Sequence, residues 1–537
     1  MSTTTNPTVA PSPFNQDSAD IVLRTSDHVH YHVHSVILSQ ASPFFRDMFS
    51  LPQPGKTVPS KAPSSDDSEK PVVDISELSA TLYTLLMIIY PVPKPLPASL
   101  SLIEAALVAA QKYDLELPMQ ALKNDLRASL PANNLLGRNS LHVWAIACRL
   151  RLEDVAQFAA TYLAFFGFDE LGDPGDAELR GVSAGDYFRL RRCCGDNFGF
   201  SRPTFKFVEP LKAASGTKNI PTLDGAAGRA TDGAFYTVPY PDVLIRSSNG
   251  AEAPAHRCVL AMASPVLRDK LVQVSEVSTV VPAPNPRPLS IFGQSQSATS
   301  ALPVLQIDEP KDILWPLLDI CCYHHLCRPE QHAAPKPPSL IILARMMAAA
   351  EKYEITHALT ELRARWNTLA RSNPLNAYLA AAEAGQHALA KDTARLVLNQ
   401  PSAICTQYSA ELENAPAQAY HRLLVYYTKC HAAIKAELSL VKAQFPDGNL
   451  KPMAKEAKEE RRWSLHSFLH NVGDSATNGA DGIVSATRSL LPEYIKWRGT
   501  ETSLSSEARQ EAKNLQNLSQ SLPIRLENAI KKVELKL

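Results

Sequence analysis

Residues 20–49, DIVLRTSDHVHYHVHSVILSQASPFFRDMF, align without a gap with residues 242–271, DVLIRSSNGAEAPAHRCVLAMASPVLRDKL. The pairs that are identical include Asp20 and Asp242, Arg24 and Arg246, His34 and His256, Leu38 and Leu260, Ala41 and Ala263, Ser42 and Ser264, Pro43 and Pro265, Arg46 and Arg268, and Asp47 and Asp269. A gapless match at a constant offset indicates that this part of the chain is duplicated.

The similarity continues beyond this stretch, after insertions. Further matching segments are PVVDIS (71–76) with PVLQID (303–308), AAQKYD (109–114) with AAAEKYE (348–354), and Ala184, Tyr187, Arg189 and Leu190 with Ala417, Tyr420, Arg422 and Leu423. The repeating unit is therefore roughly 180–200 residues long, which is the size of a domain and too large for a solenoid repeat. The sequence predicts two copies of one domain.

The local pattern predicts the same elements in each copy. DIVLRT and DVLIRS are short apolar runs followed by turn residues, and the apolar residues after them recur at helical spacing. Ser42-Pro43 and Ser264-Pro265 suit the start of a second helix, where Ser caps free N–H groups and Pro takes the first position. Each copy thus reads as strand, turn, strand and helices, followed by another strand and then helices only. We expect an α+β fold that is mostly helical overall.

At these residues the chain resembles the BTB (POZ) family, in which an Asp opens the first strand and a His precedes a helix. The doubled arrangement is similar to that of fungal proteins with two tandem BTB units. The resemblance implies a structural role, as scaffold residues, for Asp20, His34, Ser42, Tyr90, Asp242, His256, Ser264 and Tyr323.

The expected organisation follows from these repeats and from stretches without periodicity. We expect a disordered lead (1–18), a first BTB-like domain (19–130), a helical extension (131–200), a linker (201–239), a second BTB-like domain (240–370), a second helical extension (371–440) and a C-terminal helical region (441–537). Within the domains, residues 51–70 and 272–301 read as loops. In the C-terminal region, a helix through Leu504 and Leu522 is predicted to stop at Pro523.

Composition excludes several classes of protein. Lys plus Arg and Asp plus Glu both number 54, so the net charge is zero and no overall field favours nucleic acid or an anionic membrane. No apolar stretch reaches the length of a membrane span, and no secretory signal is recognisable. The 9 scattered cysteines do not form a disulfide framework. A cytoplasmic or nuclear location, or both, is expected.

Two clusters have metal-binding residue types. His28, His30, His32 and His34 alternate, and on one strand face they would suit zinc or copper, but only the last has a counterpart in the second copy. CCYHHLC (321–327) corresponds to IIYPVPK (88–94), which has no ligand. Cys193 and Cys194 have no second pair in range and read as buried thiols. We therefore expect neither a metal nor another cofactor.

The sequence has no phosphate loop, nucleophile elbow, H-E-x-x-H motif or kinase signature, so an enzyme is not expected. The family resemblance implies a protein–protein interaction scaffold, and one version is a substrate adaptor for a cullin-type ubiquitin ligase. The alternative is a nuclear regulator that acts on or near DNA. The two BTB-like units are expected to pair within one chain, because tethering raises their effective concentration. Otherwise we expect a homodimer.

Overall fold

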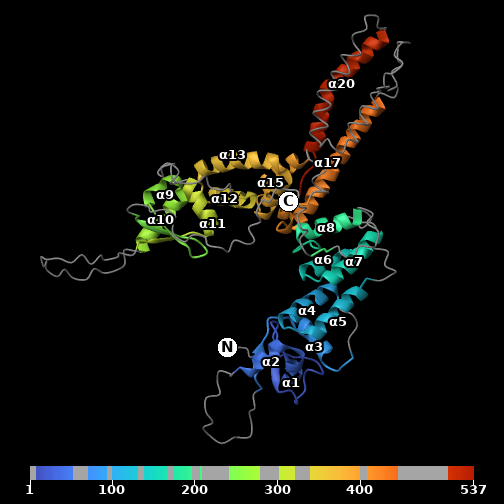
Figure 1. The fold of residues 1–537 in the computed structure, drawn as a ribbon, viewed down its shortest axis with the longest axis vertical. Coiled ribbons are helices and arrows are strands. Elements are labelled where there is room, and N and C mark those ends of the chain that lie inside the picture. Colours follow the sequence, from blue (N-terminus) through green and yellow to red (C-terminus); the bar gives the residue numbers. More distant parts are fainter. Residues whose placement is uncertain are drawn as a thin grey trace, which may run out of the picture. The chain divides into compact units, whose positions relative to one another are not determined.

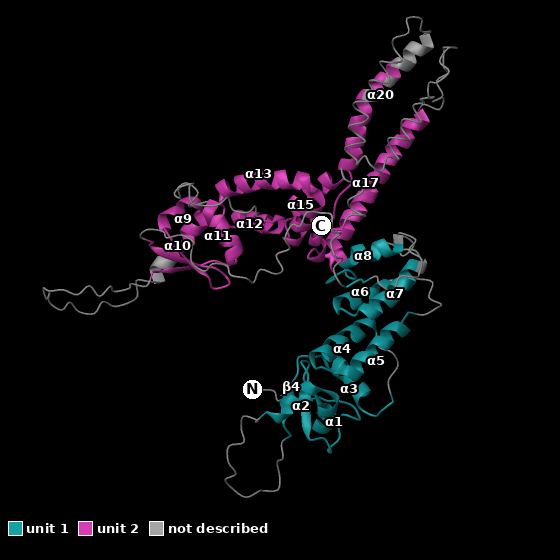
Figure 2. Ribbon diagram, viewed as in Figure 1, with its two compact units in different colours: residues 1–182, 186–211 teal, residues 183–185, 212–537 magenta. Residues whose placement is uncertain are grey.

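The computed structural model describes residues 8–51, 70–93, 99–130, 138–166, 174–195, 206–208, 241–277, 302–320, 339–398, 408–444 and 506–536. The chain divides into two compact units, which Figure 2 colours separately: residues 1–182 with 186–211, and residues 183–185 with 212–537. Helices predominate, and each unit contains one small sheet, as the α+β prediction requires. Among the described helices, none combines the length and the apolar character needed to cross a membrane.

The sheet of the first unit has four strands in the order β1-β3-β2-β4. Its strands are β1 (Thr8–Val9), β2 (Ile21–Arg24), β3 (Val29–Val33) and β4 (Val72–Asp74). β2 and β3 form an antiparallel hairpin with Ile21 opposite Val33, and β2 also pairs in parallel with β4. The β-branched and apolar residues of β2 are buried, because this strand lies inside the sheet.

In the described residues of this unit, two helices follow the hairpin and only helices follow β4, as Figure 1 shows for the helices. They are α1 (Ser35–Ala41), α2 (Pro43–Ser50), α3 (Ser79–Ile89), α4 (Leu100–Lys112), α5 (Glu116–Ala128), α6 (Arg138–Arg149), α7 (Glu153–Phe166) and α8 (Ala184–Gly195). The core includes Leu85 of α3 and Leu107 of α4, which are almost completely buried. Ser99 caps α4 by accepting a hydrogen bond from the Leu102 N–H.

The prediction that residues 1–18 form a disordered lead is wrong for Thr8 onward. β1 pairs in parallel with β3, and the carbonyl of Phe14 accepts a hydrogen bond from the His32 N–H at 2.9 Å. The Phe14 side chain is fully buried and lies against the rings of Tyr31, Tyr83 and Tyr90. The pairing of β1 with β3 and the buried ring of Phe14 hold this segment in place, although its Pro-rich composition is typical of disorder.

The second unit repeats the elements of the first from β2 to α5, in the same order. They are β5 (Val243–Arg246), β6 (Glu252–Ala255), α9 (Arg257–Ala263), α10 (Pro265–Val277), β7 (Val304–Gln306), α11 (Lys311–Leu318), α12 (Leu340–Lys352) and α13 (Thr356–Ser372). Val243 lies opposite Ala255, which is the register of Ile21 and Val33 in the first unit, and β5 again pairs in parallel with the third strand. The sheet has the order β6-β5-β7, so its described residues include no counterpart of β1.

Further helices complete the second unit. They are α14 (Pro374–Glu383), α15 (His387–Val397), the short 3-10 helix η3 (Ala410–Glu413), α17 (Ala417–Gln444) and α20 (Ser506–Lys531). α17 and α20 pack against each other, and the Arg525 guanidinium forms an ion pair with Glu437 at 2.8 Å.

The predicted stop at Pro523 is wrong, because α20 continues through this residue to Lys531. Pro removes one backbone hydrogen bond from a helix, but it does not remove the apolar stripe. Leu518, Leu522, Leu526 and Ile530 lie on one buried face that spans the Pro.

The other predicted loops, at 51–70, 201–239 and 272–301, differ in part from the structure or lie largely outside the residues that it describes. In the predicted linker 201–239, Phe207 and Val208 are buried in the first unit, where the Glu153 carboxylate accepts hydrogen bonds from both of their N–H groups. α10 extends to Val277, into the stretch 272–301 that was expected to be a loop. Residues 52–69 and 278–301 lie outside the described part of the chain.

Candidate functional site

The first predicted scaffold residue, Asp20, connects the hairpin to the start of α1. Its carboxylate accepts a hydrogen bond from the Ser35 N–H at 2.8 Å and another from the Ser35 hydroxyl at 2.5 Å. Partial burial opposes the charged form, but the Ser35 hydrogen bonds prevail and lower the pKa of Asp20. In the second unit Asp242 accepts the corresponding hydrogen bond from the Arg257 N–H at 2.7 Å. Both carboxylates thus bind the first N–H group of a helix, which has no partner inside that helix.

His34 and Tyr90 lie together at the same corner of the first unit. The His34 N–H donates to the Tyr90 hydroxyl at 2.8 Å, and the His34 ring lies within 3.2 Å of the Ser18 hydroxyl. Burial raises the pKa of Tyr90. His256 takes the matching N-cap position before α9, with the same extended backbone. Its predicted partner, Tyr323, lies outside the described residues.

The buried serines, Ser42 and Ser264, connect the second short helix to a distant helix end. The Ser42 hydroxyl donates to the Tyr113 carbonyl at 2.6 Å and accepts from the Phe45 N–H at 3.1 Å. The Ser264 hydroxyl donates to the Tyr353 carbonyl at 2.5 Å, and it accepts from the Leu267 N–H at 3.0 Å. Because each hydroxyl is fully buried and uses both its donor and an acceptor position, it fixes the helix and the distant turn together.

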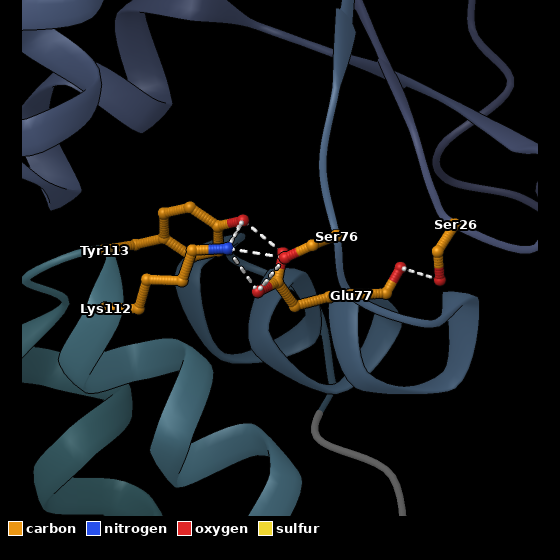
Figure 3. A network of polar contacts seen from close by, with 5 residues as sticks. All are labelled: Ser26, Ser76, Glu77, Lys112 and Tyr113. Carbon is orange, nitrogen blue, oxygen red and sulfur yellow. Dashed lines mark hydrogen bonds and ion pairs between the residues drawn. The ribbon is translucent and has the colours of Figure 1, made fainter. Parts of the chain in front are cut away.

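Sequence reasoning missed a polar network that joins the end of α4 to the loop after β4. Figure 3 shows Lys112 and Tyr113 pointing toward Ser76 and Glu77. The Lys112 ammonium lies 2.8 Å from the Glu77 carboxylate and 2.6 Å from the Ser76 hydroxyl, and the Tyr113 hydroxyl donates to the same carboxylate. The Ser26 hydroxyl donates to the Glu77 carbonyl at 3.1 Å, which ties the hairpin turn to this loop.

The second unit repeats this network. The Lys352 ammonium lies 2.9 Å from both Glu309 and Asp308, and the Tyr353 hydroxyl donates to Glu309. Burial, aided by the Glu309 hydrogen bond, raises the pKa of Tyr353 to about 12. A usable signal was present in the sequence, because a Glu follows both PVVDIS and PVLQID and a Lys-Tyr pair occurs in both AAQKYD and AAAEKYE.

The histidines of HVHYHVH do not share one strand face. β3 covers only Val29–Val33, so His30 and His32 lie on the strand, while His34 is the N-cap of α1. His28 occupies the turn, at a φ of 62°, and is exposed. Burial, with Lys70 and His30 nearby, lowers the pKa of His32.

One cysteine pair lies among the residues that the structure describes, and the other cluster does not. Cys193 and Cys194 lie in α8, and burial raises the pKa of both thiols, that of Cys194 to about 12. A high thiol pKa disfavours the thiolate that metal binding requires. CCYHHLC (321–327) lies outside the described residues. In the part of the chain that the structure describes, no group of three or more His, Cys, Asp or Glu is placed to hold a metal ion.

Comparison with known proteins identifies part of the first unit. Residues 12–130 match the family described as the BTB/POZ domain. The match begins before Phe14 and ends after α5, so it contains the whole hairpin, the Glu77 network and the first five helices. No curated protein matches the chain.

Proposed function

We propose that this chain is a non-enzymatic adaptor for protein–protein interaction that carries two BTB-like units. The match of residues 12–130 to the BTB/POZ domain supports the general class, since such domains are generally protein-interaction modules. The second BTB-like unit, residues 240–370, is supported by the repeated contacts of Asp242, Ser264 and Tyr353.

The contacts that recur in both units support a second BTB-like unit more strongly than the identical residues alone do. In each unit one carboxylate caps the first helix, one buried hydroxyl binds a distant Tyr carbonyl, and that Tyr binds a Glu in the loop after the third strand. These contacts link residues far apart in sequence, so their repetition requires the same packing of strands and helices. We further propose that residues 131–200 and 371–440 are helical extensions, that residues 441–537 are a C-terminal helical region, and that the protein acts in the cytoplasm, the nucleus or both.

One specific form of the proposal is a substrate adaptor for a cullin-type ubiquitin ligase. Two apolar side chains of the first unit are largely exposed to solvent, Leu78 at 58% and Leu117 at 60%. They are candidate contact sites, and their replacement leaves the core intact. The test mixes the purified full-length chain with the N-terminal domain of a cullin and measures the mass by light scattering during size exclusion. A stoichiometric complex that the double variant Leu78→Glu, Leu117→Glu abolishes supports the ligase form. Absence of any complex at micromolar concentration removes it.

The same preparation tests the alternative of a regulator that acts on DNA. Binding to duplex DNA that weakens steeply as salt rises would support that alternative, because phosphate contacts release counterions. The adaptor proposal predicts no such binding at low salt.

A further inference from the structure

Two charged side chains of the first unit hold a short segment that comes from the predicted linker. The Glu153 carboxylate accepts a hydrogen bond from the Phe207 N–H at 2.9 Å and another from the Val208 N–H at 2.9 Å. The Arg189 guanidinium donates to the Phe207 carbonyl at 2.6 Å. Two consecutive N–H groups that face one carboxylate form a concave, anion-binding arrangement of the backbone. The segment is thus held through its main chain, although it belongs to no helix or strand.

These contacts lie in the interior of the unit. Phe207 and Val208 are each 3% exposed, and Arg189 is completely buried. Arg189 also forms an ion pair with the buried Asp186. Burying a guanidinium is costly unless it is paired and hydrogen-bonded, so the ion pair and the Phe207 carbonyl both stabilise it there. The segment therefore combines the burial of two apolar side chains with charge-assisted hydrogen bonds, which are stronger than neutral ones.

The two carboxylates are not required for the packing of the helices. In the second unit the equivalent helices α14 and α15 pack against each other as α6 and α7 do. α7 begins with Glu153 and α15 with His387, each two residues after a residue of positive φ. At the place of Asp186 the second unit has Ala419, and the arginine alone is retained, as Arg422. The carboxylates are therefore particular to the unit that holds the segment.

We propose that Glu153 and Arg189 form a peptide-binding site of the first unit, in which Phe207-Val208 is an internal ligand that a partner's segment of the same chemistry replaces. The ligand is a short bend in which a β-branched residue follows an aromatic one. Replacement is favoured by the kind of contact, since hydrogen bonds to the main chain are open to any segment that adopts this bend. The proposal goes beyond the adaptor role, because it names one site and one ligand chemistry, and it does not depend on cullin binding.

The first test removes the internal ligand and supplies it as a peptide. The full-length variant Phe207→Ser with Val208→Ser is mixed with a fluorescein-labelled peptide of the sequence FKFVEP (205–210), and binding is followed by fluorescence anisotropy. The peptide should bind this variant at least about tenfold more tightly than the unsubstituted chain, because tethering gives the internal segment an effective concentration of about the millimolar range.

A modified peptide tests recognition of the main chain. Methylation of the peptide nitrogens that correspond to Phe207 and Val208 keeps both side chains but removes both N–H donors. Because the Glu153 carboxylate then loses its two hydrogen bonds to the ligand, this peptide should bind the variant at least about tenfold more weakly than FKFVEP does.

A matched pair of substitutions locates the contact. In the background of Phe207→Ser with Val208→Ser, Glu153→Gln replaces the charged acceptor with a neutral one of the same shape. It should weaken peptide binding at least about tenfold, because hydrogen bonds to a charged acceptor are roughly twice as strong. Asp154→Asn makes the same kind of change at the next position, where the side chain is 51% exposed and pairs with Arg127, and should leave the affinity unchanged. Circular dichroism checks that each variant is folded.

A second measurement uses the unsubstituted chain, so it does not depend on the folding of any variant. Hydrogen exchange reports the protection of the Phe207 and Val208 amides, because both N–H groups are bound to Glu153. FKFVEP at about ten millimolar exceeds the effective concentration of the tethered segment and should speed the exchange of these amides at least about tenfold. The N-methylated peptide should leave their exchange unchanged.

Several results would overturn the proposal. They are equal affinity of FKFVEP for the variant and the unsubstituted chain, no binding to a folded variant up to millimolar concentration, equal binding of the N-methylated peptide, or amide exchange that FKFVEP leaves unchanged. A dimer of the unsubstituted chain that Glu153→Gln converts to a monomer would also overturn it, because the segment would then come from a second copy of the chain.

Discussion

The hydroxyl of Tyr113 donates a hydrogen bond to the carboxylate of Glu77, and so joins the end of α4 to the loop that follows β4. Tyr353 and Glu309 make the same contact in the second unit. In both units the carbonyl of that Tyr also accepts a hydrogen bond from the buried Ser at the start of the second helix. A single Tyr thus connects three elements in each unit.

Replacement of the buried serines should destabilise each unit separately. Ser42→Ala removes a helix cap and leaves the Tyr113 carbonyl without this donor, so we expect a loss of about 1–3 kcal/mol in the free energy of unfolding. Ser264→Ala should cost the second unit a similar amount. Urea unfolding followed by hydrogen exchange in each unit measures both effects. Ser50→Ala, at an exposed position of α2, is the control, and an equal loss in this control would contradict the prediction.

The charge of Glu77 should make stability depend on pH. Burial opposes ionisation, but hydrogen bonds from Lys112 and Tyr113 lower its pKa below the ordinary value of 4.5. Since the pKa is lower in the folded state, this contribution is fully present above pH 4.5 and is lost as the pH falls through the folded-state pKa. As the pH is lowered from 6 to 3, the melting temperature should fall less steeply for Glu77→Gln than for the unsubstituted protein. Identical slopes would show that Glu77 contributes nothing.

Phe14 should be an essential anchor of the N-terminal segment. Its ring is fully buried, so Phe14→Ala should cost about 3–5 kcal/mol in the free energy of unfolding. Phe44 is 43% exposed, and Phe44→Ala should cost clearly less. Chemical denaturation of both variants makes the comparison. If Phe14→Ala is no more harmful than Phe44→Ala, Phe14 does not anchor the N-terminal segment.

Two of the residues that follow a helix with a positive φ lie one in each unit, and their substitution should change stability in different directions. Arg151 follows α6 with a φ of 58°, and Gly385 follows α14 with a φ of 70°. L-residues are strained there by about 1 kcal/mol, whereas glycine is not. A Cβ at Gly385 would meet no atom within 4 Å, so Gly385→Ala should destabilise through backbone conformation alone. Arg151→Gly should stabilise or be neutral, and a loss of stability in that variant would disprove the conformational explanation.

The sequence predicted most elements of each unit, because periodicity and local capping determine them. Ser42-Pro43 and Ser264-Pro265 start the helices that the pattern predicts. It could not place β1, because two residues of strand show no alternation and the position of Phe14 depends on Tyr31, Tyr83 and Tyr90, which are distant in sequence. α20 passes Pro523 for a similar reason, since packing on α17 outweighs local propensity. The Glu77 network requires two segments to meet, and either motif alone gives no reason to pair a Glu with a Lys-Tyr sequence.

If one structural module occurs twice in this chain, residues 242–372 must repeat the contacts of the first unit. A crystal structure of the full-length protein that resolves the side chains of residues 242–372 tests it most directly. In that structure we expect the Ser264 hydroxyl to lie within hydrogen-bond distance of the Tyr353 carbonyl, with the Tyr353 hydroxyl on Glu309 and Asp242 at the N-terminus of α9. A second unit in which Ser264 and Tyr353 lie apart, or in which β5 and β6 do not form an antiparallel hairpin, would contradict it.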